Sequence, residues 1–171
     1  EAGLEVGLAP RSVYEVGFMI APRINSMGRL LHAIDSLRLL CVKSKTKAQQ
    51  LARHLNETNV KRQKIVDEVV LHALQQVYTE RSRSIQGKPE KGVIVVAHEE
   101  YHEGVIGLAA AKLVEEFYHP AIVLAIRGNV AKASARSIFG FNIIEAIRKL
   151  EDLYIEGGGH PMAAGFSIET I

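Results

Sequence analysis

The chain has 171 residues, of which 47% are hydrophobic and 23% charged, with a formal net charge of +2. This is an ordinary soluble globular composition, and no apolar run reaches the length of a membrane span. The single cysteine, Cys41, excludes an internal disulfide framework and a cysteine-based zinc site, and it favours a reducing compartment. We therefore expect a cytoplasmic protein without a membrane partner. Because the chain starts at Glu1 without a methionine, we also expect a piece of a longer protein.

The first 45 residues resemble the edge of another domain. Residues 13–20 predict a short strand or one helical turn, and residues 31–42 predict an amphipathic helix. Between them stand three side chains that can donate hydrogen bonds to phosphate or carboxylate, Arg23, Asn25 and Arg29. On chemistry alone, a solvated helix lead-in is the preferred interpretation of these three.

A long helix is predicted over residues 47–78, with apolar residues near both ends and a polar middle over 56–64. A helix buried at its ends and solvated in the middle is typical of a strut between two globular bodies. Residues 43–64 hold seven basic residues and one acidic residue. Such a run is usually a solvated face, and the alternative is a basic wall that guides nucleic acid.

A second body is predicted to begin after a linker. Two continuous apolar strands, 92–97 and 121–126, flank a helix over 104–117, which predicts a βαβ unit with parallel strands. Ligands of such units lie beyond the carboxyl ends of the strands. His98 and His102 follow the first strand with Glu99 and Glu100 as alternative metal ligands, but we favour loop donors or solvated side chains.

The strand predicted over residues 130–138 alternates between two kinds of side chain. Lys132, Ser134 and Arg136 point to one face, and alanines point to the other, which suits close packing against a helix. The polar row is either the solvated face of an edge strand or a row of phosphate donors. A helix over 143–153 and a final strand over 164–168 follow.

Between these two elements, Gly157, Gly158 and Gly159 precede His160. Successive glycine amides can turn inward to form a nest for an anion, and histidine can donate to a phosphate oxygen. The alternative is a flexible turn before the last strand. If this segment lies across the face of Lys132, Ser134 and Arg136, the two form one phosphate pocket.

Four segments of the sequence resemble, in order and spacing, the DHH phosphoesterase superfamily, and within it the RecJ-type exonucleases. The glycine–histidine segment followed by Ala163-Ala164-Gly165 is similar to the terminal signature of the DHHA1 domain. The other three are Ala21-Pro22-Arg23-Ile24-Asn25 with Gly28-Arg29-Leu30, Tyr101-His102-Glu103-Gly104-Val105-Ile106-Gly107, and Ser134-Ala135-Arg136-Ser137 with Gly140-Phe141. Tyr101 and Glu103 depart from the usual tryptophan and proline.

The resemblance implies an α/β fold: a DHHA1-like domain with a mixed β-sheet flanked by helices, after a long connecting helix and a helical remnant of the DHH domain. We expect the remnant over residues 1–45, the helix over 46–80, a linker over 81–91 and the DHHA1 domain over 92–171. RecJ-type enzymes cut single-stranded DNA from 5′ to 3′ with two Mn²⁺ or Mg²⁺ ions held by the DHH domain. No Asp-His-His motif occurs in this sequence, so we expect no metal site and no nuclease activity in this piece alone.

The resemblance also assigns roles by position. Ser134 and Arg136, with Lys132 beside them, are expected to bind DNA phosphates. His160 and the amides of 157–159 are expected to hold a phosphate near the metals, with His102 as a further candidate. Arg23, Asn25 and Arg29 are expected either to touch the DNA or to brace the domain junction. Two alternatives stay open, a phosphoesterase for short oligonucleotides or nucleotides and a non-catalytic nucleic-acid-binding or partner-binding module.

Overall fold

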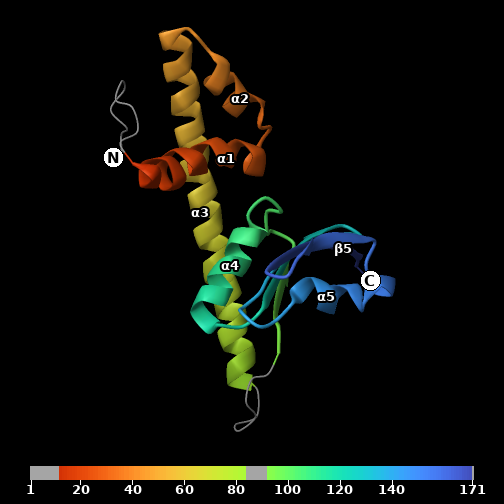
Figure 1. The fold of residues 1–171 in the computed structure, drawn as a ribbon. Helices are drawn as coiled ribbons and strands as arrows, with labels where there is room; N and C mark the ends of the chain where they lie inside the picture. Colours follow the sequence, from red (N-terminus) through yellow and green to blue (C-terminus); the bar gives the residue numbers. More distant parts are fainter. Residues whose placement is uncertain (1–11, 84–91, 171) are drawn as a thin grey trace. The chain divides into compact units, whose positions relative to one another are not determined.

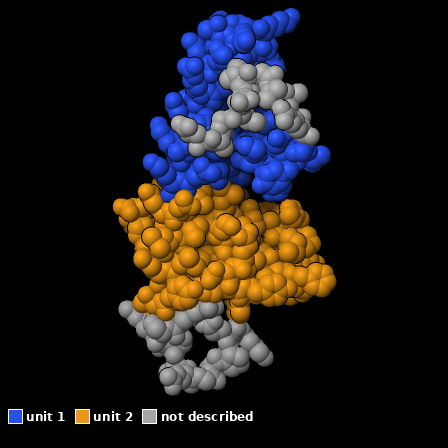
Figure 2. Space-filling view, turned by 90° about the vertical axis from the view of Figure 1, so that its left-hand side faces the viewer, with its two compact units in different colours: residues 1–64 blue, residues 65–171 orange. Residues whose placement is uncertain are grey.

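The computed structural model describes residues 12–83 and 92–170. The chain forms two compact units, residues 1–64 and residues 65–171, which we describe one at a time (Figure 2). Most of the predicted linker, residues 84–91, lies outside the described residues. In the described part, no helix combines the length and the apolar character that a membrane crossing requires.

The first unit is helical. A π-helical segment (Glu15–Ile20) leads directly into α1 (Ala21–Leu30), followed by α2 (Ile34–Cys41) and the beginning of α3 (Lys45–Arg83) (Figure 1). Of the two structures predicted for residues 13–20, the helical one is therefore confirmed. Pro22 stands in the first turn of α1, at the point where the π-helical segment passes into the α-helix.

The polar stretch of α3 is not fully solvated, and this prediction was wrong. Thr58 and Asn59 are only 3% and 4% exposed. Their polar atoms are satisfied locally, since the Thr58 hydroxyl donates to the His54 carbonyl and Arg62 donates to the Asn59 side chain. Burial of polar groups is tolerated when each has a hydrogen-bond partner.

Helix α2 forms as predicted, but its apolar side is exposed to solvent in the part of the chain that the structure describes. Leu37 and Leu40 are 56% and 67% exposed, and Leu31 just before the helix is also exposed. Cys41, the last residue of the helix, is exposed as well. An apolar row of this kind on a helix is characteristic of a surface that packs against another element.

The second unit contains a five-stranded sheet in the order β1-β2-β3-β5-β4. The strands are β1 (Ile94–His98), β2 (Ala121–Arg127), β3 (Val130–Arg136), β4 (Glu156–His160) and β5 (Ala163–Glu169). Only β1 and β2 are parallel, and α4 (Ile106–Phe117) connects them, as predicted for a βαβ unit. Helix α5 (Ile143–Arg148) and a short 3₁₀ helix (Glu151–Leu153) lie between β3 and β4.

Both faces of this sheet carry helices (Figure 1). On the alanine face of β3, Ala135 packs in one buried cluster with Ile143, Ile144 and Ile147 of α5. On the opposite face, Gly107 of α4 lies so close to β3 that a Cβ atom there would be 2.8 Å from the Ser134 Oγ. The alternation predicted for β3 is therefore confirmed, and the mixed sheet flanked by helices is the architecture of the unit.

Tyr101, in the loop between β1 and α4, connects this loop to α3. Its side chain is 1% exposed, and its hydroxyl lies 3.0 Å from the His72 Nδ1. The His72 ring also packs edge-on against His98, with centroids 4.5 Å apart. Burial raises the pKa of the Tyr101 phenol from 10.0 to about 12.

This pKa predicts a loss of stability in alkaline solution. Tyr101 is neutral below its pKa, so its contribution is fully present below about pH 10 and is lost as the pH rises towards 12. Over that interval the unfolded chain releases the proton while the folded chain retains it. In urea titrations at stepped pH, Tyr101→Phe should therefore lose stability less steeply than the wild type. At neutral pH the variant should lose about 1 kcal/mol with the hydrogen bond to His72. If the free energy of unfolding fell equally steeply with pH above pH 10 in the wild type and in Tyr101→Phe, the raised pKa of Tyr101 would be contradicted.

Candidate nucleic-acid interface

The pairing of β3, β5 and β4 places polar residues in rows across one face of the sheet. Arg136 is opposite Ala163, which is opposite His160, and Ser134 is opposite Gly165, which is opposite Gly158. Directly opposed residues of antiparallel strands point to the same face. Neighbouring strands are about 4.8 Å apart, so the backbones at positions 136 and 160 are separated by about 10 Å. We call this surface the polar face: Lys132, Ser134 and Arg136 of β3 with Glu156, Gly158 and His160 of β4.

The glycine segment is a strand and not a loop, so the predicted nest geometry was wrong, while the predicted contact of its amides with phosphate stays a prediction. Residues Glu156–His160 form β4, an exposed edge strand paired with β5. At Gly159, φ is +154° and a Cβ atom would lie 2.4 Å from the Ala163 carbonyl oxygen. Glycine is required there for the close approach of two strands. Gly158 has nothing within 4 Å of its Cβ direction, so it leaves the polar face open.

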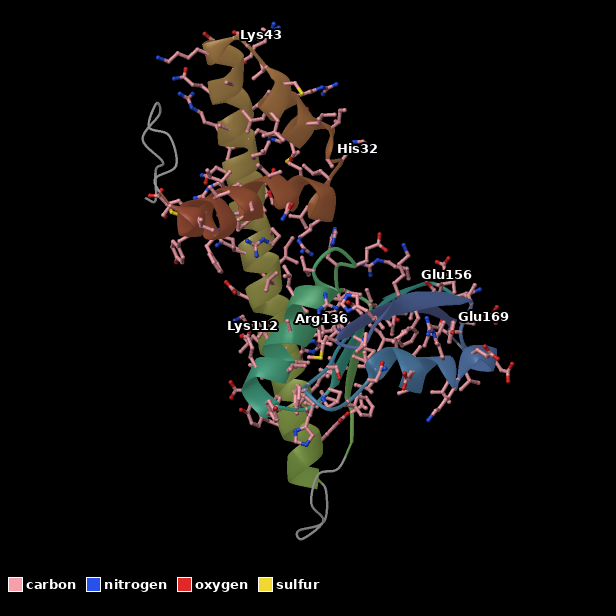
Figure 3. All side chains as sticks on the ribbon, in the orientation of Figure 1. His32, Lys43, Lys112, Arg136, Glu156 and Glu169 are labelled. Carbon is pink, nitrogen blue, oxygen red and sulfur yellow. The ribbon has the colours of Figure 1, made fainter. Side chains whose placement is uncertain are left out.

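Arg136 lies beside α4 at one end of the polar face (Figure 3). Its Nη1 donates to the Ser134 Oγ at 3.1 Å and to the Ala135 carbonyl at 2.8 Å. A Cβ atom on Gly107, the second residue of α4, would be 2.9 Å from the Arg136 Nη2. Since no side chain caps the start of α4, a guanidinium, a hydroxyl and a helix N-terminus meet here. These groups are suited to the oxygens of a phosphate.

Lys132, at the other end of the polar face, is paired with an acid. Its Nζ lies 2.8 Å from a carboxylate oxygen of Glu103, in the loop before α4. The hydrogen bond from Lys132 is the main cause that lowers the pKa of the Glu103 carboxyl, and the same bond raises the pKa of the lysine. Sequence reasoning noted Glu103 only as a departure from the family and missed this pair, which depends on how the loop meets β3.

His102 is held within its own loop. Its Nδ1 accepts a hydrogen bond from the Gly104 amide at 3.0 Å, which fixes the ring next to the start of α4. Its predicted contact with phosphate stays a prediction.

The remaining three predicted residues belong to the first unit. Arg23 braces that unit, since its Nε donates to the Asn56 Oδ1 at 3.0 Å and its Nη1 to the Met19 carbonyl. Asn25 is exposed and Arg29 is half-buried on the same helix. These contacts of Arg23 agree with the bracing role, which is one of the two roles expected for it.

The donor set for a metal is absent from the part of the chain that the structure describes. No group of three or more His, Cys, Asp or Glu side chains there is placed to hold an ion. His98, considered as a ligand, instead accepts from the Glu100 amide and packs against His72. The two-metal centre of the family does not fit these residues.

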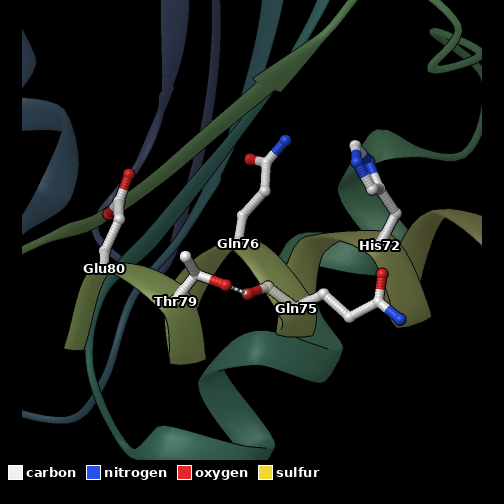
Figure 4. A pocket seen from close by; sticks show the side chains of 5 residues that line it. All are labelled: His72, Gln75, Gln76, Thr79 and Glu80. Atoms are coloured by element: carbon white, nitrogen blue, oxygen red, sulfur yellow. Dashed lines mark hydrogen bonds between the residues drawn. The ribbon is translucent and has the colours of Figure 1, made fainter. Parts of the chain in front are cut away.

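A depression of about 290 Å³ lies along one side of α3 in the second unit (Figure 4). Its lining consists of His72, Gln75, Gln76, Thr79 and Glu80. It has no lysine or arginine, so it offers a phosphate no fixed cation.

Comparison with known proteins gives one family and a consistent set of relatives. Residues 90–171 match the DHHA1 domain family. The single-stranded-DNA-specific exonuclease RecJ of Bacillus subtilis is 40% identical over 91% of this chain and 19% of its own length. RecJ of Thermus thermophilus, solved with Mg²⁺, is similar with a TM-score of 0.77 and 36% identity over 90% of this chain and 23% of that one. An exonuclease RecJ bound to manganese gives a TM-score of 0.75 and 34% identity over 92% of this chain and 37% of that one.

The chain spans between 19% and 27% of the length of the curated relatives that it matches. The similarity to the RecJ relatives extends across both units, because the alignment with RecJ of Thermus thermophilus covers 96% of this chain. Residues 90–171 therefore belong to the DHHA1 domain family, within a chain that is similar throughout to one segment of the RecJ exonucleases.

Proposed function

We propose that this chain is the substrate-binding part of a 5′→3′ single-stranded-DNA exonuclease that hydrolyses phosphodiester bonds. The observation that carries the proposal is that Arg136, Ser134 and His160 lie on one face of a DHHA1 domain, with Arg136 and Ser134 beside the start of α4. Curated relatives of this chain are named single-stranded-DNA-specific exonucleases. The corresponding processes are DNA repair and recombination in the cytoplasm.

Four residues of the polar face have a proposed role in holding one phosphate. The Arg136 guanidinium and the Ser134 hydroxyl donate to its oxygens, and His160 donates from two strands away. Gly158 leaves the space between them empty, because a side chain there would stand on the same face. The amides of 157–159, with Lys132 and His102, border this site. Arg23, Asn25 and Arg29 are second-line contacts in the other unit.

The metals of the reaction belong, in this proposal, to a DHH domain of the same protein that this chain does not contain. RecJ structures similar to this chain were solved with Mg²⁺ or Mn²⁺. In the intact enzyme, such ions would supply the Lewis-acid chemistry for hydrolysis. The residues of this chain bind and orient the phosphate. The exposed apolar row of Leu31, Leu37 and Leu40 is the surface that we expect the DHH domain to cover.

The test compares this chain with the full-length protein. The chain should bind single-stranded DNA weakly, with an affinity that falls steeply with salt, and should release no nucleotides with Mn²⁺. The full-length protein should degrade a 5′-phosphorylated single strand in preference to a dinucleotide. Metal-dependent hydrolysis by the pure chain would refute this division of labour, and preference for the dinucleotide would favour an oligonucleotide phosphoesterase.

A further inference from the structure

We propose that Glu103 acts as an internal competitor for Lys132, so that only the Arg136–His160 end of the polar face accepts a DNA phosphate. This inference rests on the proposed function and adds a residue that limits where the DNA backbone binds. Its starting observation is the 2.8 Å ion pair between the Lys132 Nζ and the Glu103 carboxylate.

The charges on the polar face are divided along the direction of β3. At one end, Lys132 lies opposite Ser167, which lies opposite Glu156, and the Ser167 Oγ donates to the Glu156 Oε1 at 3.4 Å. With Glu103 on its other side, the lysine stands between two carboxylates. At the other end, Arg136 and His160 share a row that contains no acid.

The carboxylate of Glu103 uses the same donor that a phosphate oxygen would use. A lysine ammonium is a compact charge, and a carboxylate at hydrogen-bond distance occupies one of its donors and offsets part of its charge. A phosphate that approaches Lys132 must displace Glu103 and also meets the negative charge of Glu156. The lysine end therefore rejects the DNA backbone although it carries a basic residue.

The competitor is weak enough to be removed by one substitution. The side chains of Lys132 and Glu103 are 57% and 51% exposed, and ion pairs this open to solvent contribute little to stability. Glu103→Gln should therefore leave the fold intact and set the lysine free. In the proposed site, this variant adds a second phosphate contact to the one at Arg136.

The experiment measures binding of a 5′-phosphorylated oligothymidylate to the chain by fluorescence anisotropy across a salt series. Glu103→Gln should bind about twofold to fivefold more tightly at low salt. The slope of log affinity against log salt should steepen by about 0.7, the value for one further phosphate contact on a single strand. In the double variant Glu103→Gln with Lys132→Gln, both gains should disappear.

Glu115→Gln is the matched control, because it removes the same charge from another exposed ion pair, Lys112–Glu115 at 2.6 Å, on α4. It should change the affinity by less than Glu103→Gln and leave the salt slope unchanged. If Glu103→Gln behaves like Glu115→Gln, or if its gain survives the loss of Lys132, the inference is wrong while the proposed function stands. If neither the wild type nor any variant binds, the proposed function fails together with it.

Discussion

Replacing Gly159 by alanine should lower the free energy of unfolding by about 2–4 kcal/mol. A Cβ atom at this position would lie 2.4 Å from the Ala163 carbonyl oxygen and 2.6 Å from the Ala164 Cα, both of them backbone atoms of the paired strand. The strands must separate to admit it, and φ of +154° is itself unfavourable for alanine. For a chain of this size the melting temperature should fall by about 5–15 °C, measured by circular dichroism.

Gly158→Ala is the control for this prediction. Nothing lies within 4 Å of its added Cβ atom, so stability should change by no more than about 0.5 kcal/mol. The new methyl group stands on the polar face, and DNA binding should weaken although the fold is intact. Similar losses of stability in both variants would show that the conformation of β4 differs from the one described.

Removal of Arg136 is expected to have the largest effect on DNA binding. Arg136→Ala should weaken the affinity for single-stranded DNA by about 10-fold to 100-fold, because hydrogen bonds between charged groups contribute about 1.5–3 kcal/mol each. Arg136→Lys keeps the charge but loses the planar guanidinium, so its affinity should lie between that of the wild type and that of Arg136→Ala. Anisotropy titrations of the chain would measure this. An unchanged affinity for Arg136→Ala would remove this residue from the site.

A second variant separates binding from folding, since Arg136 also holds Ser134 and the Ala135 carbonyl. In Gly107→Ala, the new Cβ atom would lie 2.8 Å from the Ser134 Oγ and 2.9 Å from the Arg136 Nη2. The Arg136 guanidinium is the end of a flexible side chain and the Ser134 hydroxyl can change rotamer, so the sheet and α4 need not separate. Stability should therefore change by no more than about 1 kcal/mol while DNA binding falls. If Gly107→Ala bound DNA as tightly as the wild type, the present position of the Arg136 guanidinium would not be needed for DNA binding.

The sequence was most informative where a short-range pattern determines the structure. The alternation of β3 could be read directly, because successive side chains of a strand point to opposite faces, and one of its alanines, Ala135, packs as expected against a helix, α5. The βαβ order also predicted the parallel pair β1 and β2.

Features that depend on how separate elements pair or pack were not predictable. Three consecutive glycines have low strand propensity, and β4 exists because β5 pairs with it. The ion pair of Glu103 with Lys132 requires the position of a loop against a strand. Likewise, the periodicity of α2 correctly predicted a helix but could not show that its apolar side is exposed to solvent in the described part of the chain.

The alternation of β3 also restricts how this domain can change in evolution. An insertion or deletion of a single residue inside Val130–Arg136 would exchange the two faces, bury the basic row against α5 and expose the alanines. A change of two residues would preserve both faces but move the donors along the strand relative to α4. Variation in chain length among descendants of this sequence should therefore concentrate in the turns, such as the one at Gly128 with φ of +56°, and spare the strand itself.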